Sequence, residues 1–215
     1  MAKVFLGVGH GGSDPGAIGV NGVHEADLNL SIALACQAEL VRHGVSVLMS
    51  RTKDENDTIN DEIKECNAYN PDLAIDIHNN AGGGDGAEAY HHHGGGKGKV
   101  LAENVLAEIV AIGQNSRGAK IRKNASGKDY YAFIRETLAP AIIVECAFVD
   151  NAKDMQIIDT EAERKVMGVA IAKGILKTLG IAWVAEPKPE PIAKEYVLDV
   201  AKLKADGYSK IVLSI

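Results

Sequence analysis

Short apolar runs rich in β-branched residues alternate with segments of helical periodicity over the first 180 residues of the chain. The apolar runs predict strands at residues 4–8, 45–49, 73–77, 87–93 and 141–149, and the helical periodicity predicts helices at about 27–44, 59–69, 100–112 and 160–179. Residues 117–130 are polar and basic and are expected to form a surface loop. Strands that alternate with helices predict an α/β fold, with a mostly parallel sheet covered by helices on both faces.

Composition narrows the class of protein. The 215 residues include 23 basic and 29 acidic side chains, a net charge of −6, which disfavours nucleic acid and anionic membrane surfaces as partners. No apolar stretch approaches the ~18 residues that span a bilayer, and the first residues do not resemble a signal peptide. The three scattered cysteines, Cys36, Cys66 and Cys146, predict buried thiols. We therefore expect a protein made in the cytoplasm without a membrane span, and its oligomeric state stays open.

Three polar side chains stand where predicted strands end or turn polar. His10 follows the first strand, His78 follows the third, and Glu145 interrupts the last apolar run. The carboxyl ends of parallel strands share one edge of a sheet, so these side chains are expected to converge, and Glu25 can fold over the same edge from the end of a glycine-rich loop. Two imidazoles and one carboxylate are a common ligand set for catalytic zinc, with a second carboxylate as proton acceptor. We therefore interpret His10, Glu25 and His78 as ligands and Glu145 as the base.

Simpler interpretations stay open beside this one. A single histidine flanked by glycines, such as His10, is more often a loop residue than a ligand. A carboxylate in a buried strand needs a cation nearby, so Glu145 could instead form an ion pair with Arg135 or a lysine.

Two further sets of residues invite a chemical interpretation. Cys146 with His78 as a base would suggest a cysteine hydrolase, but neighbouring strand residues point to opposite faces, so a packing role is expected for this thiol. Residues 91–93 are three consecutive histidines, which cannot all bind one ion from a strand. We expect them to face solvent or line a groove, with substrate contact as the other possibility.

Four motifs occur in a familiar order: VGHGGSDPGAIG at 8–19, GVHE at 22–25, IDIHNNA at 75–81 and PAIIVECAFVDN at 140–151. Together they resemble the motifs of the zinc-dependent N-acetylmuramoyl-L-alanine amidases of the amidase-3 family, over about residues 3 to 180. The resemblance implies a twisted six-stranded sheet flanked by helices. It also implies one zinc ion per chain, held by His10, Glu25 and His78, and a catalytic glutamate at Glu145.

The same resemblance implies a substrate, bacterial peptidoglycan, cut at the amide between N-acetylmuramic acid and L-alanine of the stem peptide. A zinc peptidase that cuts within the stem peptide and a wall-binding module without catalysis are the alternatives. Arg117, in a basic cluster, and Asn80 are expected to contact the substrate. The sequence departs from the family pattern at Asp76, where a small hydroxyl residue is expected, and at Cys146-Ala147.

The last part of the chain predicts a different organisation. Residues 183–191 include three prolines and are expected to form a linker after a catalytic domain at 1–182. Residues 192–215 predict one helix and one strand, too few to bury a core alone, so they are interpreted as packing on the main domain, as a dimerisation segment or as the remnant of a wall-binding module. With no signal peptide, this organisation favours a phage or prophage endolysin released by a holin.

Overall fold

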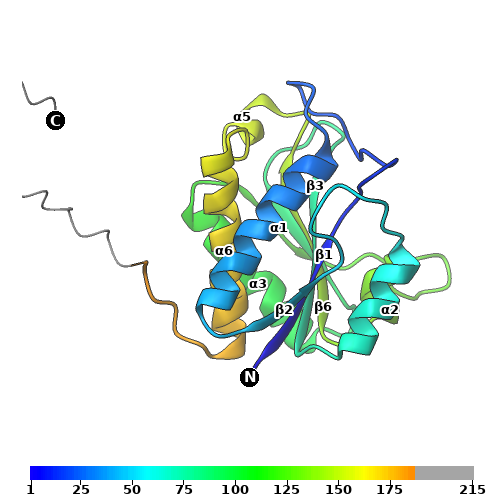
Figure 1. Cartoon of the computed structure of the whole chain (residues 1–215). Helices are drawn as coiled ribbons and strands as arrows, with labels where there is room; N and C mark the ends of the chain where they lie inside the picture. The colour runs from blue at the N-terminus through cyan, green and yellow to red at the C-terminus, as the bar shows by residue number, and fades with distance from the viewer. Residues whose placement is uncertain (187–215) are drawn as a thin grey trace, which may run out of the picture. The chain divides into compact units, whose positions relative to one another are not determined.

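A six-stranded sheet forms the centre of the chain in the computed structural model, which describes residues 1–186 (Figure 1). The strands are β1 Lys3–Val8, β2 Ser46–Met49, β3 Leu73–Asn80, β4 Ala87–His91, β5 Ser116–Lys120 and β6 Ala141–Phe148, in the spatial order β2-β1-β3-β6-β4-β5. β2, β1, β3 and β6 are parallel, β4 runs antiparallel to β6, and β5 is parallel to β4. The predicted α/β fold with a mostly parallel sheet is confirmed.

Helices cover both faces of this sheet (Figure 1). The large apolar cluster joins the sheet to α1 Glu25–Arg42, α3 Gly96–Ala111 and α6 Glu161–Leu179. A smaller cluster joins the other face to α2 Ile59–Tyr69 and α4 Ala132–Glu136, and α5 Ala152–Met155 is a single short turn. In the sequence, both α4 and α5 are too short for helical periodicity to indicate them.

The ends of the longer helices follow from local side-chain chemistry. Thr160 and Glu163 form a capping box at the start of α6, and Gly180 ends that helix in the left-handed conformation. The side chain of Thr58 accepts a hydrogen bond from the backbone N–H of Asp61 at the start of α2. α2 ends at Tyr69, the predicted position, shortly before Pro71, because the residue before a proline avoids helical geometry.

Strand alternation decides where polar side chains can gather. Ile75, Ile77 and Val144 point into the large cluster, whereas Ala74, Ala141 and Ile143 point into the smaller one. The smaller cluster fills only the amino ends of the strands on its face. Asp76, His78 and Glu145 continue the same face toward the carboxyl ends, where no apolar cluster covers them. Polar side chains from neighbouring strands are therefore concentrated at one edge of the sheet.

Several predicted boundaries are wrong, among them the end of the strand expected over 87–93, because β4 ends at His91. Residues 117–120 were expected in a surface loop but belong to the edge strand β5, which pairs on one side only and carries no apolar alternation for a pattern to detect. β3 continues through His78 to Asn80, with a register shift between these two residues, so His78 lies inside the strand rather than after it.

The expected linker and C-terminal segment lie largely outside the described residues, which end at 186. Within them, residues 1–184 form one compact unit. Trp183 donates a hydrogen bond from Nε1 to Oε1 of Glu39 at 2.5 Å, and the backbone N–H of Val184 donates to Nε2 of His43 at 2.9 Å. In the part of the chain that the structure covers, no helix is long and apolar enough to cross a bilayer.

Candidate metal centre

His10 is the first residue of the centre and lies in the loop that follows β1. Its backbone is left-handed, with φ 63°, a conformation that an L-residue adopts only where its surroundings enforce it. Part of that enforcement comes from the buried guanidinium of Arg51, which donates to the carbonyl oxygens of Val8 and Gly9. Nδ1 of His10 lies 2.8 Å from Oδ2 of Asp14, which leaves Nε2 facing Glu25 at 3.2 Å.

Glu25 occupies the first position of α1, where the helix dipole favours a negative charge. Its carboxylate accepts hydrogen bonds from the backbone N–H groups of Ala17, at 3.0 Å, and Asn79, at 3.1 Å. Burial opposes ionisation, but hydrogen bonds with both histidines outweigh it and hold the pKa of Glu25 well below its ordinary value. Glu25 is therefore a fixed anionic oxygen donor.

His78 completes the group from β3. Nδ1 of its ring lies 3.2 Å from Oε1 of Glu25, and Nε2 lies 3.1 Å from Oδ2 of Asp76. The rings of His10 and His78 meet edge to face, with centroids 5.1 Å apart. Burial by itself lowers the pKa of His78, but the carboxylates of Asp76 and Glu25 raise it well above the ordinary value. The centre thus favours positive charge at the two imidazoles.

The donor set fits a divalent metal ion. One ligand atom each from His10, Glu25 and His78 lies within 4.8 Å of the other two. The backbone is also shaped to this group: a Cβ atom on Gly9 would lie 2.1 Å from Cε1 of His78, and one on Gly16 would lie 2.7 Å from Oε2 of Glu25. A cavity of about 360 Å³ reaches this centre. Two imidazoles and a carboxylate with open space beside them match a catalytic zinc site.

Glu145 lies beside this centre without joining it. It is the cross-strand neighbour of His78 on β6, and its buried Oε2 atom has no hydrogen-bond partner among the described residues. Burial raises the pKa of Glu145 to about 7. The suggested partner Arg135 instead donates to the carbonyl oxygens of Asp129 and Tyr130, so an ion pair with Arg135 is wrong. A half-buried carboxylate with a raised pKa, opposite His78 in the sheet, is suited to proton transfer.

Two further buried carboxylates, those of Asp76 and Glu62, lie near His78. Asp76 and Glu62 are 2% and 5% exposed, and Oδ1 of Asp76 and Oε1 of Glu62 lack hydrogen-bond partners within the described chain. Burial and the nearby Asp76 raise the pKa of Glu62 well above its ordinary value. Asp76 is the residue at which the sequence departs from the family pattern. Its Oδ2 atom lies 3.1 Å from Nε2 of His78, so a carboxylate faces this metal-ligand candidate directly.

Asn80 and Arg117, the expected substrate contacts, both bind Glu88. Nδ2 of Asn80 donates to Oε1 of Glu88 at 3.1 Å, and Nε of Arg117 donates to Oε2 at 2.6 Å. Lys120 also forms an ion pair with this carboxylate, which is 3% exposed and lies opposite Glu145 across the β4–β6 pair. Sequence reasoning missed Glu88, although a carboxylate within a predicted strand was the signal that had identified Glu145.

Replacing Glu88 by glutamine is expected to lower the free energy of unfolding by about 1–3 kcal/mol at pH 7, because Arg117 and Lys120 lose their buried anionic partner. Burial opposes ionisation of Glu88, but hydrogen bonds from Lys120 and Arg117 lower its pKa. The contribution is therefore present above the unfolded pKa of about 4.3 and lost as the pH falls through the lower folded value. Urea unfolding of both proteins at several pH values measures this contribution of Glu88 to the free energy of unfolding.

The exposed Glu103 on α3, replaced in the same way, is the control for this prediction, because its ion pair with Lys99 is solvated. An equal loss of stability in both variants, or a difference between parent and Glu88→Gln that does not shrink as the pH falls below 4, would contradict the assigned role of Glu88.

The remaining expected residues lie away from the centre. Cys146 is fully buried in the large apolar cluster, and burial raises the pKa of its thiol well above the ordinary value, which confirms the packing role. His91 pairs with Ile142, at the opposite end of β6 from the carboxyl edge. The antiparallel direction of β4 thus carries residues 91–93 away from Glu145. His92 is exposed and lines a pocket, as expected, and a substrate contact by these residues stays a prediction.

Comparison with known proteins identifies the family. Residues 4–177 match the N-acetylmuramoyl-L-alanine amidase family (Amidase_3). The sporulation-specific N-acetylmuramoyl-L-alanine amidase of Bacillus subtilis (strain 168) is 34% identical over 179 residues, which cover 81% of this chain and 67% of that protein. An endolysin of Bacillus phage SPP1 is 28% identical over 223 residues, which cover 97% of this chain and 79% of that protein.

Solved structures give the same answer for the fold. Cwp6 from Clostridium difficile superposes with a TM-score of 0.81 and 38% sequence identity, over 83% of this chain and 29% of that chain. The present chain thus corresponds to one part of that longer protein. The family resemblance stated from the four motifs is confirmed, and the chain belongs to the N-acetylmuramoyl-L-alanine amidase family.

Proposed function

We propose that this chain is a zinc-dependent hydrolase that cuts the amide between N-acetylmuramic acid and L-alanine of peptidoglycan, with Glu145 as general base. The observation that carries the proposal is the convergence of His10, Glu25 and His78, with ligand atoms within 4.8 Å of one another, beside a carboxylate whose buried Oε2 atom has no hydrogen-bond partner among the described residues. Family membership supplies the bond that is cut.

Each residue has a defined task in this mechanism. His10, Glu25 and His78 would hold the ion, with the second ring nitrogen of each histidine bonded to Asp14 or Asp76. Bound zinc supplies a Lewis acid that polarises the scissile carbonyl and lowers the pKa of a water molecule. Glu145 accepts the proton of the attacking water and passes it to the nitrogen of L-alanine as the amide breaks. Its pKa of about 7 suits both steps.

Asn80 and Arg117 are proposed to bind the substrate beside this centre. The guanidinium of Arg117 stacks 5.0 Å from the centroid of Phe148, and Glu88 fixes its Nε, so its remaining N–H groups are positioned at low entropic cost. The side chain is 37% exposed. We expect it to attract carboxylates of the stem peptide.

Replacing Arg117 by alanine is expected to raise KM about tenfold and to change kcat little, because one exposed charged hydrogen bond is lost from binding. Lys123→Ala, an exposed cation of the following segment, is the matched control. Steady-state kinetics on a soluble muropeptide measure both constants. A fall in kcat at unchanged KM would instead place Arg117 among the residues that act on the transition state.

Replacing Asp76 by asparagine is expected to weaken zinc binding roughly 10- to 100-fold, because the hydrogen bond from Nε2 of His78 remains but the negative charge behind the ligand is lost. Competition with a chromogenic chelator measures this affinity. The midpoint temperature of thermal unfolding of the metal-free protein is expected to rise, since the buried charge of Asp76 next to Glu62 is removed.

Glu62→Gln is the matched control for Asp76→Asn, because it relieves the same repulsion between the two carboxylates but leaves the hydrogen bond between Asp76 and His78 in place. It should raise the stability of the metal-free protein and leave the zinc affinity near that of the parent. Equal zinc affinities for the parent and Asp76→Asn would contradict the role of Asp76.

The bond that is cut separates the proposal from its alternatives. Mass spectrometry of peptidoglycan digested with the purified protein is expected to find intact stem peptides that begin with a free L-alanine. Shortened stem peptides would favour a zinc peptidase, and pelleting with purified wall without any soluble product would favour a binding module.

We propose that the protein reaches the wall by release from the producing cell, as suggested by its similarity to an endolysin along 97% of the chain. Expression in the cytoplasm of a bacterium should leave the culture turbid until the membrane is permeabilised. Lysis without permeabilisation would argue for export instead.

A further inference from the structure

A second cluster of metal-ligand side chains lies where β4 ends. Nε2 of His92 and Nδ1 of His93 lie 3.1 Å and 2.8 Å from the same oxygen, Oδ2 of Asp129. The two rings stack with centroids 4.4 Å apart, and the three ligand atoms lie within 4.8 Å of one another. β4 ends at His91, so His92 and His93 are free of the strand alternation that would send them to opposite faces.

This cluster repeats the donor pattern of the catalytic centre. Each of the two contains one histidine facing a carboxylate through Nε2 and one through Nδ1, and in each the carboxylate is almost fully buried. Among the described residues, these are the two groups of histidine, cysteine, aspartate or glutamate with that spacing. They lie on different parts of the sheet, because β4 runs antiparallel to β6.

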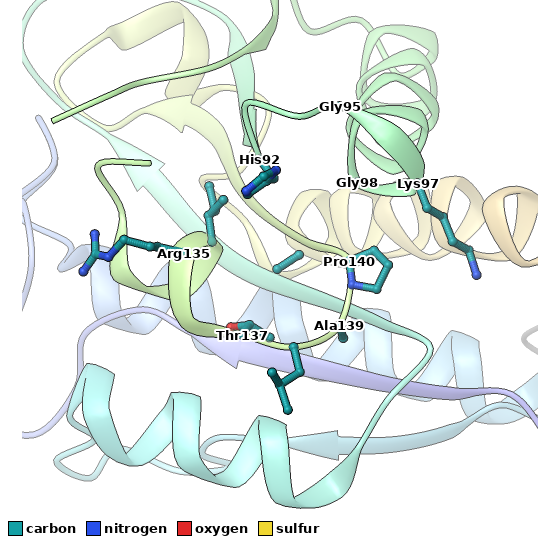
Figure 2. A pocket seen from close by; sticks show the side chains of 11 residues that line it. His92, Gly95, Lys97, Gly98, Arg135, Thr137, Ala139 and Pro140 are labelled. Carbon is teal, nitrogen blue, oxygen red and sulfur yellow. The ribbon is translucent and has the colours of Figure 1, made fainter. Parts of the chain in front are cut away.

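The surroundings give the cluster rigidity on one side and access on the other. Asp129 is 3% exposed, and its Oδ1 accepts the backbone N–H of His93 at 2.9 Å, so the carboxylate is fixed. The side chains of His92 and His93 are 51% and 36% exposed. Figure 2 shows His92 at the wall of a pocket of about 300 Å³, so solvent reaches the cluster from that side.

Arg135, a cation that lines the same pocket (Figure 2), does not compete for this carboxylate. It pairs with Oε1 of Glu136 at 2.7 Å and donates to the backbone carbonyl of Asp129 rather than to its side chain. One existing contact would have to open, the hydrogen bond from the N–H of Gly94 to Nδ1 of His92, because an imidazole bound through Nε2 carries its proton on Nδ1.

We propose that His92, His93 and Asp129 form a second, structural site for a divalent transition-metal ion of the zinc class, separate from the catalytic centre. Imidazole and carboxylate donors suit zinc, cobalt and nickel. An ion here would join the end of β4 to the segment 121–131, in addition to the ring contact of Tyr90 with Tyr131, whose centroids lie 4.9 Å apart. The inference does not depend on the proposed function, since it concerns other residues and another readout.

The test is a count of bound metal in the parent and three variants, each stripped with chelator, reloaded with zinc chloride at pH 7.5 and desalted. Inductively coupled plasma mass spectrometry should find two zinc ions per chain in the parent, one in His78→Ala and one in His92→Ala/His93→Ala. The double variant should keep its amidase activity, which also shows that it folds. His24→Ala, an exposed histidine outside both clusters, should keep two ions.

A second measurement does not rely on folding of the double variant. In the His78→Ala background, zinc should raise the midpoint of thermal unfolding, and adding Asp129→Asn should abolish that rise. One ion per chain in the parent, or two that persist in His92→Ala/His93→Ala, would overturn the proposal. Loss of the second ion with retained amidase activity leaves the catalytic proposal intact, so the two proposals fail separately.

Discussion

Replacing Glu145 by glutamine is expected to lower kcat by roughly 10²- to 10⁴-fold while leaving the metal content of the protein equal to that of the parent. Glutamine keeps the size of the side chain but cannot accept a proton. The buried Oε2 atom has no hydrogen-bond partner in the described part of the chain, so the substitution breaks no hydrogen bond of that atom. Because burial raises the pKa of Glu145 to about 7, its replacement by a neutral side chain should also raise the free energy of unfolding at neutral pH.

Metal analysis and wall lysis together decide the role of Glu145. The control is Glu103→Gln on the exposed face of α3, which should match the parent in activity, metal content and stability. A variant Glu145→Gln that loses both zinc and activity would move Glu145 into the ligand set. Glu25, now interpreted as the third ligand, would then be the candidate for the base.

The pH dependence of catalysis offers an independent check on Glu145. Burial raises the pKa of this carboxyl to about 7, and only the ionised form accepts a proton, so activity should fall about tenfold per pH unit below that pKa. A cation bound by the three ligands favours the ionised form, so this limb is expected at or below pH 7. The residual activity of Glu145→Gln should not show this fall at low pH.

The convergence of His10, His78 and Glu145 could be predicted from the sequence because strand direction decides where these three residues lie. His10, His78 and Glu145 stand at strand ends or within a buried strand, and parallel strands bring such positions to one edge. Four motifs in order then identified the family. Periodicity could not identify β5, because an edge strand with one neighbour needs no apolar face.

Other features required three-dimensional neighbours that sequence spacing does not provide. Glu88 is important because Asn80, Arg117 and Lys120 all reach it, and these residues come from β3 and β5 on either side of the antiparallel β4. The charge of Asp76 has its effect because α2 places Glu62 against it. The His92 and His93 cluster depends on a loop residue, Asp129, which lies 36 positions after His93.

Replacing His78 by alanine is expected to remove one equivalent of zinc per chain and to abolish measurable lysis. His78 supplies one of three ligand atoms, and its loss also leaves Asp76 and Glu25 buried without the imidazole between them. Two protein ligands, His10 and Glu25, then remain, one fewer than the three that hold zinc in catalytic sites. Added zinc at high concentration should therefore restore little activity.

His24→Ala distinguishes loss of a ligand from loss of any histidine near the site. His24 precedes Glu25 in the chain, is exposed and makes no side-chain hydrogen bond that caps α1, so its removal should leave both zinc and lysis unchanged. If His78→Ala keeps its full zinc content, the ion must be held elsewhere, and the convergence of His10, Glu25 and His78 would have to be explained by hydrogen bonds alone. If it loses zinc but keeps lysis, Glu145 must act without a Lewis acid beside it, and the proposed mechanism fails while family membership stands.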